Sequence, residues 1–553
     1  MERLGEPHHV AGIGVLYVAL NRLAVADAFV LFCSSVALLF VLLCLVYRRV
    51  MPAVVTLGVA VLTMLWAIGL YGAAGRSLNI VTTAMPTVLL VVGTAEMVHI
   101  LLYAASRQQG GTRREKAVSI LGHMLRPCLL NILTSALGFA ALATSPLPAV
   151  RDLGIFTAAG LLGCLVLTVL ACAFVLGSSR CEPRPRGNRW LRQAAVRLCE
   201  LGIRHPVPTL AIWAAVMLAA TAAASRVEVD TYTIEYLARD HPVRRDSEFI
   251  EANLAPYVPM EFLVRSVDGA VYPDLLEAIE RWQSAGDRVP GVGWSRSPVN
   301  WLRQHEQRFP AGISFDERLD EYRDSAGARL DPRLDRDGTL RVTFSVRMQS
   351  AKSVGRTMQT LVELAHMPYG ATVQPAGYLP LYARMISYVV DSQISGFLFA
   401  FAAVFGVIAL AFRSVKIAIL AVPSNLLPLV FILGVMGASG IRLDAATVTI
   451  ASVVLGLVVD DTVHFLHRLR ADLARYTDPA TALRTTVSST GHAILATAVV
   501  MTLAFSVFAL SEIRSLVYFG LLIALAMATS VLTDLLLIPA LVMLRPSGAR
   551  SRP

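Results

Sequence analysis

Long apolar stretches separated by short polar segments are the dominant pattern along this chain. A helix needs about 20 apolar residues to cross a hydrocarbon core of roughly 30 Å. Eleven stretches meet that length, and they cover residues 29–47, 52–74, 80–103, 127–145, 153–178, 207–225, 393–412, 416–439, 445–467, 493–511 and 516–544. The pattern therefore predicts a polytopic α-helical membrane protein with about eleven transmembrane helices.

The polar region between residues 226 and 385 has a different pattern. "MEFLVRSV" (260–267) and "LRVTFSVRM" (340–348) are typical of strands, whereas residues 272–285 and 353–367 carry apolar residues at helical spacing. This order predicts one extracytoplasmic α+β module of ferredoxin-like type.

The chain also aligns with itself, which indicates an internal repeat. "SLNIVTTAMPTVLLVVGTAEMVHIL" (77–101) matches "RLDAATVTIASVVLGLVVDDTVHFL" (442–466) at an offset of 365 residues. This offset pairs Arg48 with Arg413, Gly75 with Gly440, Leu78 with Leu443, Thr82 with Thr447, Glu96 with Asp461 and His99 with His464. After one inserted residue the offset is 366, and it pairs Phe139 with Phe505, Ser145 with Ser511 and Gly154 with Gly520.

Six spans lie between equivalent positions, so both copies have the same orientation, as in parallel-repeat transporters. "AGIGVLY" (11–17) aligns with "AGYLPLY" (376–382), which makes Met1 the counterpart of His366. The first copy then lacks a counterpart of the span at 207–225 and of about 140 residues after it. We therefore expect a twelve-span, two-module protein without its beginning, through biological loss, a split gene or a misassigned start.

These patterns divide the chain into seven parts. They are 1–28, a remnant of a first external domain with a juxtamembrane helix; 29–178, a first transmembrane repeat; 179–206, an Arg-rich cytoplasmic linker; 207–225, a transmembrane helix; 226–385, the external α+β domain; 386–545, the second transmembrane repeat; and 546–553, a cytoplasmic tail.

Composition supports the membrane assignment. The 553 residues are 55% hydrophobic and only 16% charged, and the mean hydropathy of +0.60 is far above that of soluble globular proteins. The formal charge of +10 arises from arginines in short loops between spans, so it indicates cytoplasmic loops and not a nucleic-acid partner. Seven cysteines fall in spans or cytoplasmic segments and none in 226–385, so no disulfide framework is expected.

Several enzyme classes lack their motifs here. A P-loop needs Gly-Lys before Ser or Thr, and the three lysines follow Glu115, Ala351 and Val415. The chain contains no GxSxG, HExxH or CxxC motif. We expect neither an enzyme nor a cofactor or resident metal.

The candidate chemistry lies in "GLVVDDTVHFLHRLR" (456–470), at the end of an apolar run. On a helix Asp460, Asp461 and His464 share one broad face, and Glu96 with His99 repeats the i, i+3 pair in the first copy. Ionisable residues inside a span normally face the protein interior or a water cavity and mark ion or proton paths. Neighbouring carboxylates with a histidine can take up and release protons, so we predict that these five residues form a proton relay.

Other interpretations of these residues remain open. One is that the carboxylates only hold helices together through buried hydrogen bonds, and another is that Asp461, His464 and His467 bind a metal. Asp534 is intramembrane near the cytoplasmic end, where a solvated or capping role competes with a functional one. Weaker candidates are Thr82, Thr134, Thr447 and Thr497 for the relay, "DPATALRTTVSS" (478–489) as an amphipathic linker helix, and Met501, Phe505 and Phe508 for packing.

These motifs resemble the resistance-nodulation-division (RND) superfamily. The similarity is to its hydrophobe and lipid exporters, a branch that includes the mycobacterial large membrane proteins (MMPL) and hopanoid transporters and is related to Patched and the sterol-sensing-domain proteins. Residues 456–470 resemble that branch's middle-span signature. The segment "YLARDHPVRRDSEFIEANL" (236–254) resembles the opening of its second external domain, and "TDLLLIPAL" (533–541) resembles its final span.

The resemblance implies a proton-driven exporter of hydrophobic or amphiphilic molecules in the bacterial inner membrane, with its porter domain in the periplasm. By position, the relay role falls on Asp460 and Asp461, and through the repeat on Glu96. Two departures from the family pattern are Ala95 in place of a second acid and the missing first external domain. The expected partners are a lipid or other hydrophobic substrate, the membrane and protons, with a homo-oligomer or an upstream-encoded partner chain left open. The alternative is a non-transporting lipid-binding or scaffold subunit, or an inactive fragment.

Overall fold

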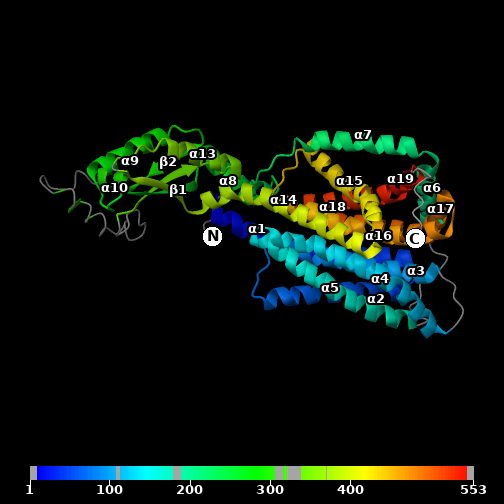
Figure 1. Ribbon diagram of the computed structural model, residues 1–553. Coiled ribbons are helices and arrows are strands. Elements are labelled where there is room, and N and C mark those ends of the chain that lie inside the picture. The colour runs from blue at the N-terminus through cyan, green and yellow to red at the C-terminus, as the bar shows by residue number, and fades with distance from the viewer. Residues whose placement is uncertain are drawn as a thin grey trace. The chain divides into compact units, whose positions relative to one another are not determined.

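The computed structural model describes residues 9–106, 112–177, 189–304, 314, 317–318, 321, 338–368 and 370–544 (Figure 1). The chain forms two compact units, one of Met1–Leu20 with Asp230–Ser387 and the other of Asn21–Val229 with Tyr388–Pro553. The predicted tail 546–553 and part of the predicted linker 179–206 lie outside the described residues. We describe each unit by itself.

Within the described residues, eleven helical segments are long and apolar enough to cross a membrane. The first five segments are α1 (Ile13–Tyr47), α2 (Val50–Ala73), α3 (Met85–Ser106) with η1 (Thr82–Ala84), α4 (Arg113–Ala140) with η2 (Ala141–Thr144), and α5 (Pro148–Gly177). The remaining six are α7 (Pro206–Ala224), α14 (Tyr378–Phe412), α15 (Val415–Ser439), α16 (Ile450–Arg475) with η5 (Thr447–Thr449), α17 (Pro479–Phe505) with η6 (Ser506–Leu510), and α18 (Arg514–Leu532) with η7 (Thr533–Leu537) and α19 (Ile538–Met543). The predicted polytopic helical fold is confirmed.

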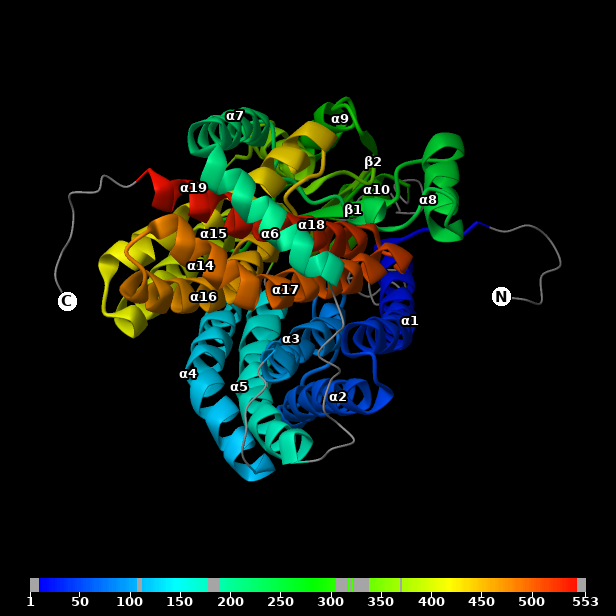
Figure 2. The same cartoon turned by 90° about the vertical axis from the view of Figure 1, so that its right-hand side faces the viewer.

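The helix bounds confirm the parallel repeat. α1 and α14 begin and end 365 residues apart, α2 and α15 begin at the same offset, and so do α3 and α16. From α4 and α17 onward the helices begin 366 residues apart. In Figure 2 the first-half helices α2 to α5 gather on one side of the second-half helices α16 and α17.

Turns between the helices repeat as well, down to the backbone conformation. Arg48 and its counterpart Arg413 both have positive φ, 54° and 47°. Gly75 and Gly440 both have a φ of 67°. A left-handed backbone is costly for arginine, so its occurrence at both equivalent positions shows that the two halves build the same tight turn between their first two helices.

The entrances to α3 and α16 are also built alike. The Asn79 Oδ1 atom accepts a hydrogen bond from the Thr82 backbone N–H at 3.1 Å. Its counterpart Asp444 does the same for the Thr447 backbone N–H at 2.8 Å. Both threonine hydroxyls also bond within these turns. Such side-chain caps satisfy backbone donors at a helix start, and they fix where each of the two central helices begins.

The α+β unit has a four-stranded antiparallel sheet in the order β2-β3-β1-β4. Its strands are β1 (Val258–Arg265), β2 (Val292–Arg296), β3 (Leu340–Val346) and β4 (Thr372–Ala376), and its helices are α8 (Pro242–Asn253), α9 (Pro273–Gly286), α10 (Pro298–Gln304) and α13 (Ala351–Glu363). Trp282 on α9 packs edge-on against Phe262 and Phe344 of the sheet. The structure confirms an α+β module with strands and helices at the predicted places and adds β2, β4, α8 and α10.

Two local predictions need correction. Residues 478–489 do not form a separate linker helix, because they are the first turns of α17, which Asp478 caps by accepting hydrogen bonds from two backbone N–H groups. The second half of the predicted linker forms a helix, α6 (Arg189–Arg204). Its buried residues Leu191, Ala195, Cys199 and Ile203 recur every four positions. The last three pack in a cluster made mainly of second-half residues, whereas Leu191 packs in a cluster made mainly of first-half residues.

Candidate functional site

The helices α3 and α16 occupy the centre of the helical bundle. In the most apolar window of α16 every residue is buried, and in that of α3 89% are, against 22% for α1 and 11% for α7. Polar side chains on the two central helices therefore face other protein groups. The five predicted relay residues all lie on these two helices and are all buried.

Each half holds its central acid with a hydrogen bond from the next helix. Asn131 on α4 donates its amide to Glu96, and Thr497 on α17 donates its hydroxyl to Asp461 at 3.0 Å. The offset of 366 makes Asn131 and Thr497 equivalent positions. The repeat therefore preserves the position of the acid and of its donor, although both residue types differ.

The histidines connect the two halves. His99 Nε2 of the first half lies 3.5 Å from Asp461 Oδ1 and 3.7 Å from Asp460 Oδ1 of the second half. His464 Nε2 lies 3.7 Å from Asp460 Oδ1, and the two imidazole rings stack with centroids 4.3 Å apart. The structure thus brings all five residues into one cluster, which we call the central cluster: Glu96, His99, Asp460, Asp461 and His464.

Several polar atoms of the central cluster have no hydrogen-bond partner among the described residues. They are Glu96 Oε2, His99 Nε2, Asp460 Oδ1 and His464 Nε2. Buried polar atoms are nearly always satisfied, so four such atoms in one cluster indicate a place for water, protons or an ion. A purely structural hydrogen-bonded core would leave fewer of them open.

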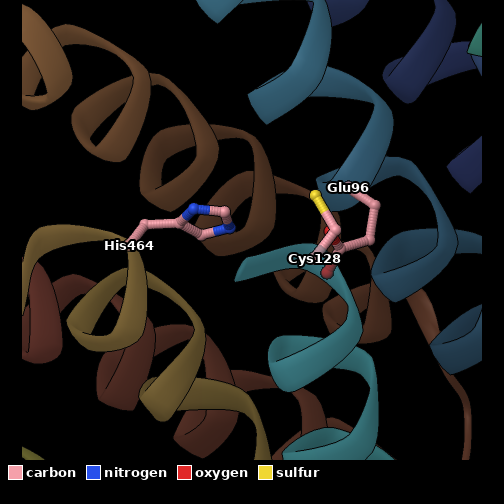
Figure 3. Close-up of side chains that lie close together, drawn as sticks. All are labelled: Glu96, Cys128 and His464. Atoms are coloured by element: carbon pink, nitrogen blue, oxygen red, sulfur yellow. The ribbon is translucent and has the colours of Figure 1, made fainter. Parts of the chain in front are cut away.

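Sequence reasoning missed Cys128 and Asn131. Cys128 lies on α4 beside Glu96, and His464 reaches toward both (Figure 3). No motif marks Cys128, and its proximity to α16 follows only from how α4 crosses that helix. A signal existed for Asn131, because it is the repeat counterpart of Thr497 in an otherwise apolar stretch.

The metal triad considered from the sequence is not formed. Within the described residues, the two sets whose ligand atoms lie within 4.8 Å of one another are Glu96–Cys128–His464 and His99–Asp460–His464. His467 is one turn away and lines a cavity. The triad of Asp461, His464 and His467 was therefore wrong, because the neighbouring helix α4 supplies ligands that spacing along α16 does not reveal.

Asp534 is not solvated. Its side chain is fully buried in the π-helical stretch η7, and it accepts a hydrogen bond from Thr462 Oγ1 at 2.8 Å. Thr462 directly follows Asp461 in α16, so Asp534 extends the acidic region of the second half. The sequence suggested solvation because Asp534 lies near the end of a span, whereas neighbouring helices cover it.

The remaining candidates have local roles. Thr134 Oγ1 donates to the backbone oxygen of Asn131 within its own helix. Met501, Phe505 and Phe508 are buried, as expected for packing residues.

A cavity of about 290 Å³ adjoins the central cluster. Its lining includes five histidines, namely His99, His123, His464, His467 and His492. His467 also borders a second cavity, of about 520 Å³, whose lining includes Arg126, Arg413 and Arg470. The histidine-lined cavity thus adjoins the central cluster at His99 and His464 and shares His467 with the cavity at the arginine-rich end of the bundle.

The sequence matches the model of the MMPL family over residues 7–201 and 339–551. These two ranges cover most of the chain and both transmembrane halves. The chain belongs to the MMPL family. The resemblance to the RND superfamily, and to its MMPL branch, is therefore confirmed, and RND and MMPL proteins are transporters.

Two known proteins are similar to this MMPL-family chain, one in sequence and one in fold. A protein of Methanocaldococcus jannaschii named as a membrane protein, MJ1562, is 26% identical over 183 residues, which are 33% of this chain and 47% of that protein. The chain thus matches about half the length of this curated relative. The cryo-EM structure of the hedgehog release protein Disp from the water bear Hypsibius dujardini superposes with a TM-score of 0.67, covering 94% of this chain and 70% of that one at 14% identity. That likeness shows a shared fold.

Proposed function

We propose that this chain is a proton-driven exporter of hydrophobic or amphiphilic molecules, lipids among them, in the bacterial inner membrane, with its α+β unit in the periplasm. Membership of a transporter family supports transport in general. The observation that carries the proton-driven mechanism is the central cluster, in which acids and histidines of both halves meet on the two most buried helices.

The geometry supports coupling between protons and movement of the halves. His99 belongs to the first half, whereas Asp460 and Asp461 belong to the second, so a change in the charge of any of them alters the attraction between α3 and α16. One proton crossing 100 mV releases about 2.3 kcal/mol. Opposite charges about 4 Å apart interact by about 4 kcal/mol at an effective dielectric constant of about 20, so one proton can shift the balance between two arrangements of the helices.

The adjoining cavity supports a route for protons. His99 and His464 of the central cluster line it together with His123, His467 and His492, and imidazoles exchange protons near physiological pH. Protons would enter or leave by this route.

The test is Asp461→Asn, which keeps the size of the side chain but removes its proton. The purified protein is reconstituted into liposomes of phosphatidylethanolamine and phosphatidylglycerol that contain a pH-sensitive dye. We expect wild type to dissipate an imposed pH gradient and to transfer a fluorescent phospholipid to acceptor vesicles, and Asp461→Asn to lose at least about 100-fold of both. The matched control is Asp391→Asn, which alters an exposed aspartate of α14.

Two outcomes would contradict the proposal. Equal rates for Asp461→Asn and wild type would remove the relay role from the central cluster. Lipid binding by wild type without proton movement or lipid transfer would favour a lipid-binding or scaffold subunit.

A further inference from the structure

Cys128 lies beside the central cluster, and the proposed relay gives it no task. Its thiol lies on α4, the Glu96 carboxylate on α3 and the His464 imidazole on α16 (Figure 3). One ligand atom from each of the three lies within 4.8 Å of the others, and all three side chains are buried, with exposed fractions of 2%, 2% and 8%. Sulfur, oxygen and nitrogen donors from three helices thus converge on one point.

Two of these donors are free to bind a ligand. Glu96 Oε2 and His464 Nε2 have no hydrogen-bond partner among the described residues. The other carboxylate oxygen, Glu96 Oε1, accepts the hydrogen bond from Asn131. Metal-binding carboxylates are typically held by such an outer partner, so Asn131 orients Glu96 with one oxygen left for the ligand.

The donor types select the ion. Ca²⁺ takes six to eight oxygen ligands, and Mg²⁺ needs near-octahedral oxygen coordination, so a site of one sulfur, one nitrogen and one oxygen suits neither. Zn²⁺ binds cysteine, histidine and carboxylate together, often through three protein ligands with the fourth position open to water. We propose that Glu96, Cys128 and His464 form a binding site for one Zn²⁺ ion inside the helical bundle. Binding would displace the Cys128 thiol proton, because the thiolate is the ligand.

A cavity reaches one of the three proposed ligands, His464. The cavity of about 290 Å³ is lined by His464 and leads past His123, His467 and His492. Arg468 also lines it, but its charge is paired with Asp472 at 2.9 Å. Neutral imidazoles are common zinc ligands. Single histidines of the cavity wall would therefore bind the ion weakly before it reaches Glu96, Cys128 and His464.

A bound ion would fix two groups of the central cluster. Glu96 and His464 would be held by the metal and could no longer change their protonation. We therefore expect micromolar Zn²⁺ to inhibit transport, an expectation that rests on the proposed function, whereas the binding site itself does not.

The first test measures binding alone. The full chain without an affinity tag is purified in detergent and titrated with Co²⁺, a spectroscopic substitute for Zn²⁺, against a competing chelator that removes ions from weak surface sites. We expect one Co²⁺ per chain, a sulfur-to-cobalt charge-transfer band, and displacement by Zn²⁺. A complex without that band would overturn the assignment, since the neighbouring set of His99, Asp460 and His464 contains no thiol.

Variants then assign the ligands. Cys128→Ser should abolish the band and weaken Zn²⁺ binding more than Asn131→Ala, which should cost about 10- to 100-fold as an outer partner. The matched control is Cys164→Ser, a buried cysteine of α5 that bonds to Gly93 and Thr168. Equal Zn²⁺ affinity for Cys128→Ser and wild type would overturn the site.

A separate measurement distinguishes the two proposals. If Zn²⁺ binds at Cys128 but wild type moves no protons in liposomes, the site stands and the relay falls. If protons move but Zn²⁺ does not bind, the relay stands and the site falls.

Discussion

Glu200 and Arg484 join helix α6 to α17 through a paired interaction at the edge of the bundle. Arg484 donates two hydrogen bonds to the two carboxylate oxygens of Glu200, at 2.9 and 3.0 Å, and Arg204 donates a third at 2.7 Å. Bidentate arginine–carboxylate pairs are stronger and more specific than single contacts. Arg484, and to a lesser extent Arg204, lowers the pKa of Glu200 to about 2.

This pKa gives a pH-dependent prediction. Because the folded-state pKa of Glu200 lies below its ordinary value of 4.5, the pair stabilises the fold above pH 4.5 and loses that effect as the pH falls towards 2. We expect Glu200→Gln to lower the free energy of unfolding at pH 7 by about 1 kcal/mol or less, since solvent screens the pair. Thermal unfolding of wild type and variant should converge as the pH falls through that range.

The matched control is Glu277→Gln, which alters an exposed glutamate of α9. A difference between wild type and Glu200→Gln that stays constant from neutral to acidic pH would show that Glu200 acts by packing and not by charge.

At the same scale, the sequence predicts only part of the candidate site. Asp460, Asp461 and His464 lie within two turns of one helix, so helical spacing alone places them on one face. The repeat adds Glu96 and His99. Cys128 joins the cluster because two helices cross at a particular angle and depth, and a single sequence carries no signal for that geometry.

At the scale of elements, helices α4 and α16 cross in close contact near the central cluster. A Cβ atom on Gly138 would lie 2.6 Å from the Cα atom of Gly456, so the two backbones touch there. Ser135 Oγ donates to the backbone oxygen of Gly456 at 3.0 Å across the same crossing. Small residues allow such approach in membrane bundles, and the crossing sets the distance of Cys128 and Asn131 from α16.

Gly138→Ala tests this crossing. The added methyl group meets backbone atoms and not a flexible side chain, so we expect a loss of about 1 to 3 kcal/mol in unfolding free energy, as for overpacked cores. Thermal unfolding in detergent measures it. Gly122→Ala in the same helix is the control, because a methyl group there meets no atom within 4 Å; it should be neutral or slightly stabilising. Equal stability of the two variants would contradict close contact at Gly138.

The elements themselves show where sequence patterns suffice. The length of the apolar stretches and the internal repeat predict the helices that are apolar on most sides. Such helices have this pattern because they contact lipid or pack against one another. Helix α6 was missed because it is amphipathic and short, although its buried residues at 191, 195, 199 and 203 have helical spacing. The π-helical turn at Thr533–Leu537 was missed because local widening of a helix leaves the hydrophobic pattern unchanged.

At the scale of the whole helical unit, two equivalent side-chain hydrogen bonds join the first half to the second, and their residue types differ. Ser145 and Ser392 share a hydrogen bond of 2.6 Å. The equivalent residues are Ser511 and Asp27, and here the serine hydroxyl donates to a buried carboxylate. The Glu512 backbone N–H also donates to Asp27, so the second junction is the more polar of the two.

The two junctions should respond differently to the same substitution. Ser511→Ala leaves a buried carboxylate with one donor fewer and should cost about 1.5 to 3 kcal/mol of unfolding free energy, whereas Ser145→Ala breaks a bond between neutral groups and should cost about 0.5 to 1.5 kcal/mol. Thermal unfolding of both single variants shows which substitution lowers the free energy of unfolding more. A larger loss for Ser145→Ala would contradict the expected dependence of Asp27 on the Ser511 hydroxyl.

Alanine at position 95, where the other half carries Asp460, has a consequence for the order of events in a working cycle. In a dimer of identical subunits, the state in which one subunit has reacted has the same energy as the state in which the other has reacted. Either subunit can therefore react first. In the proposed relay no such pair of equivalent states exists, because the second half contributes three titratable groups, Asp460, Asp461 and His464, and the first half two, Glu96 and His99. Each intermediate of that relay would have its own energy, and the asymmetry of the covalent chain would fix the order of the steps.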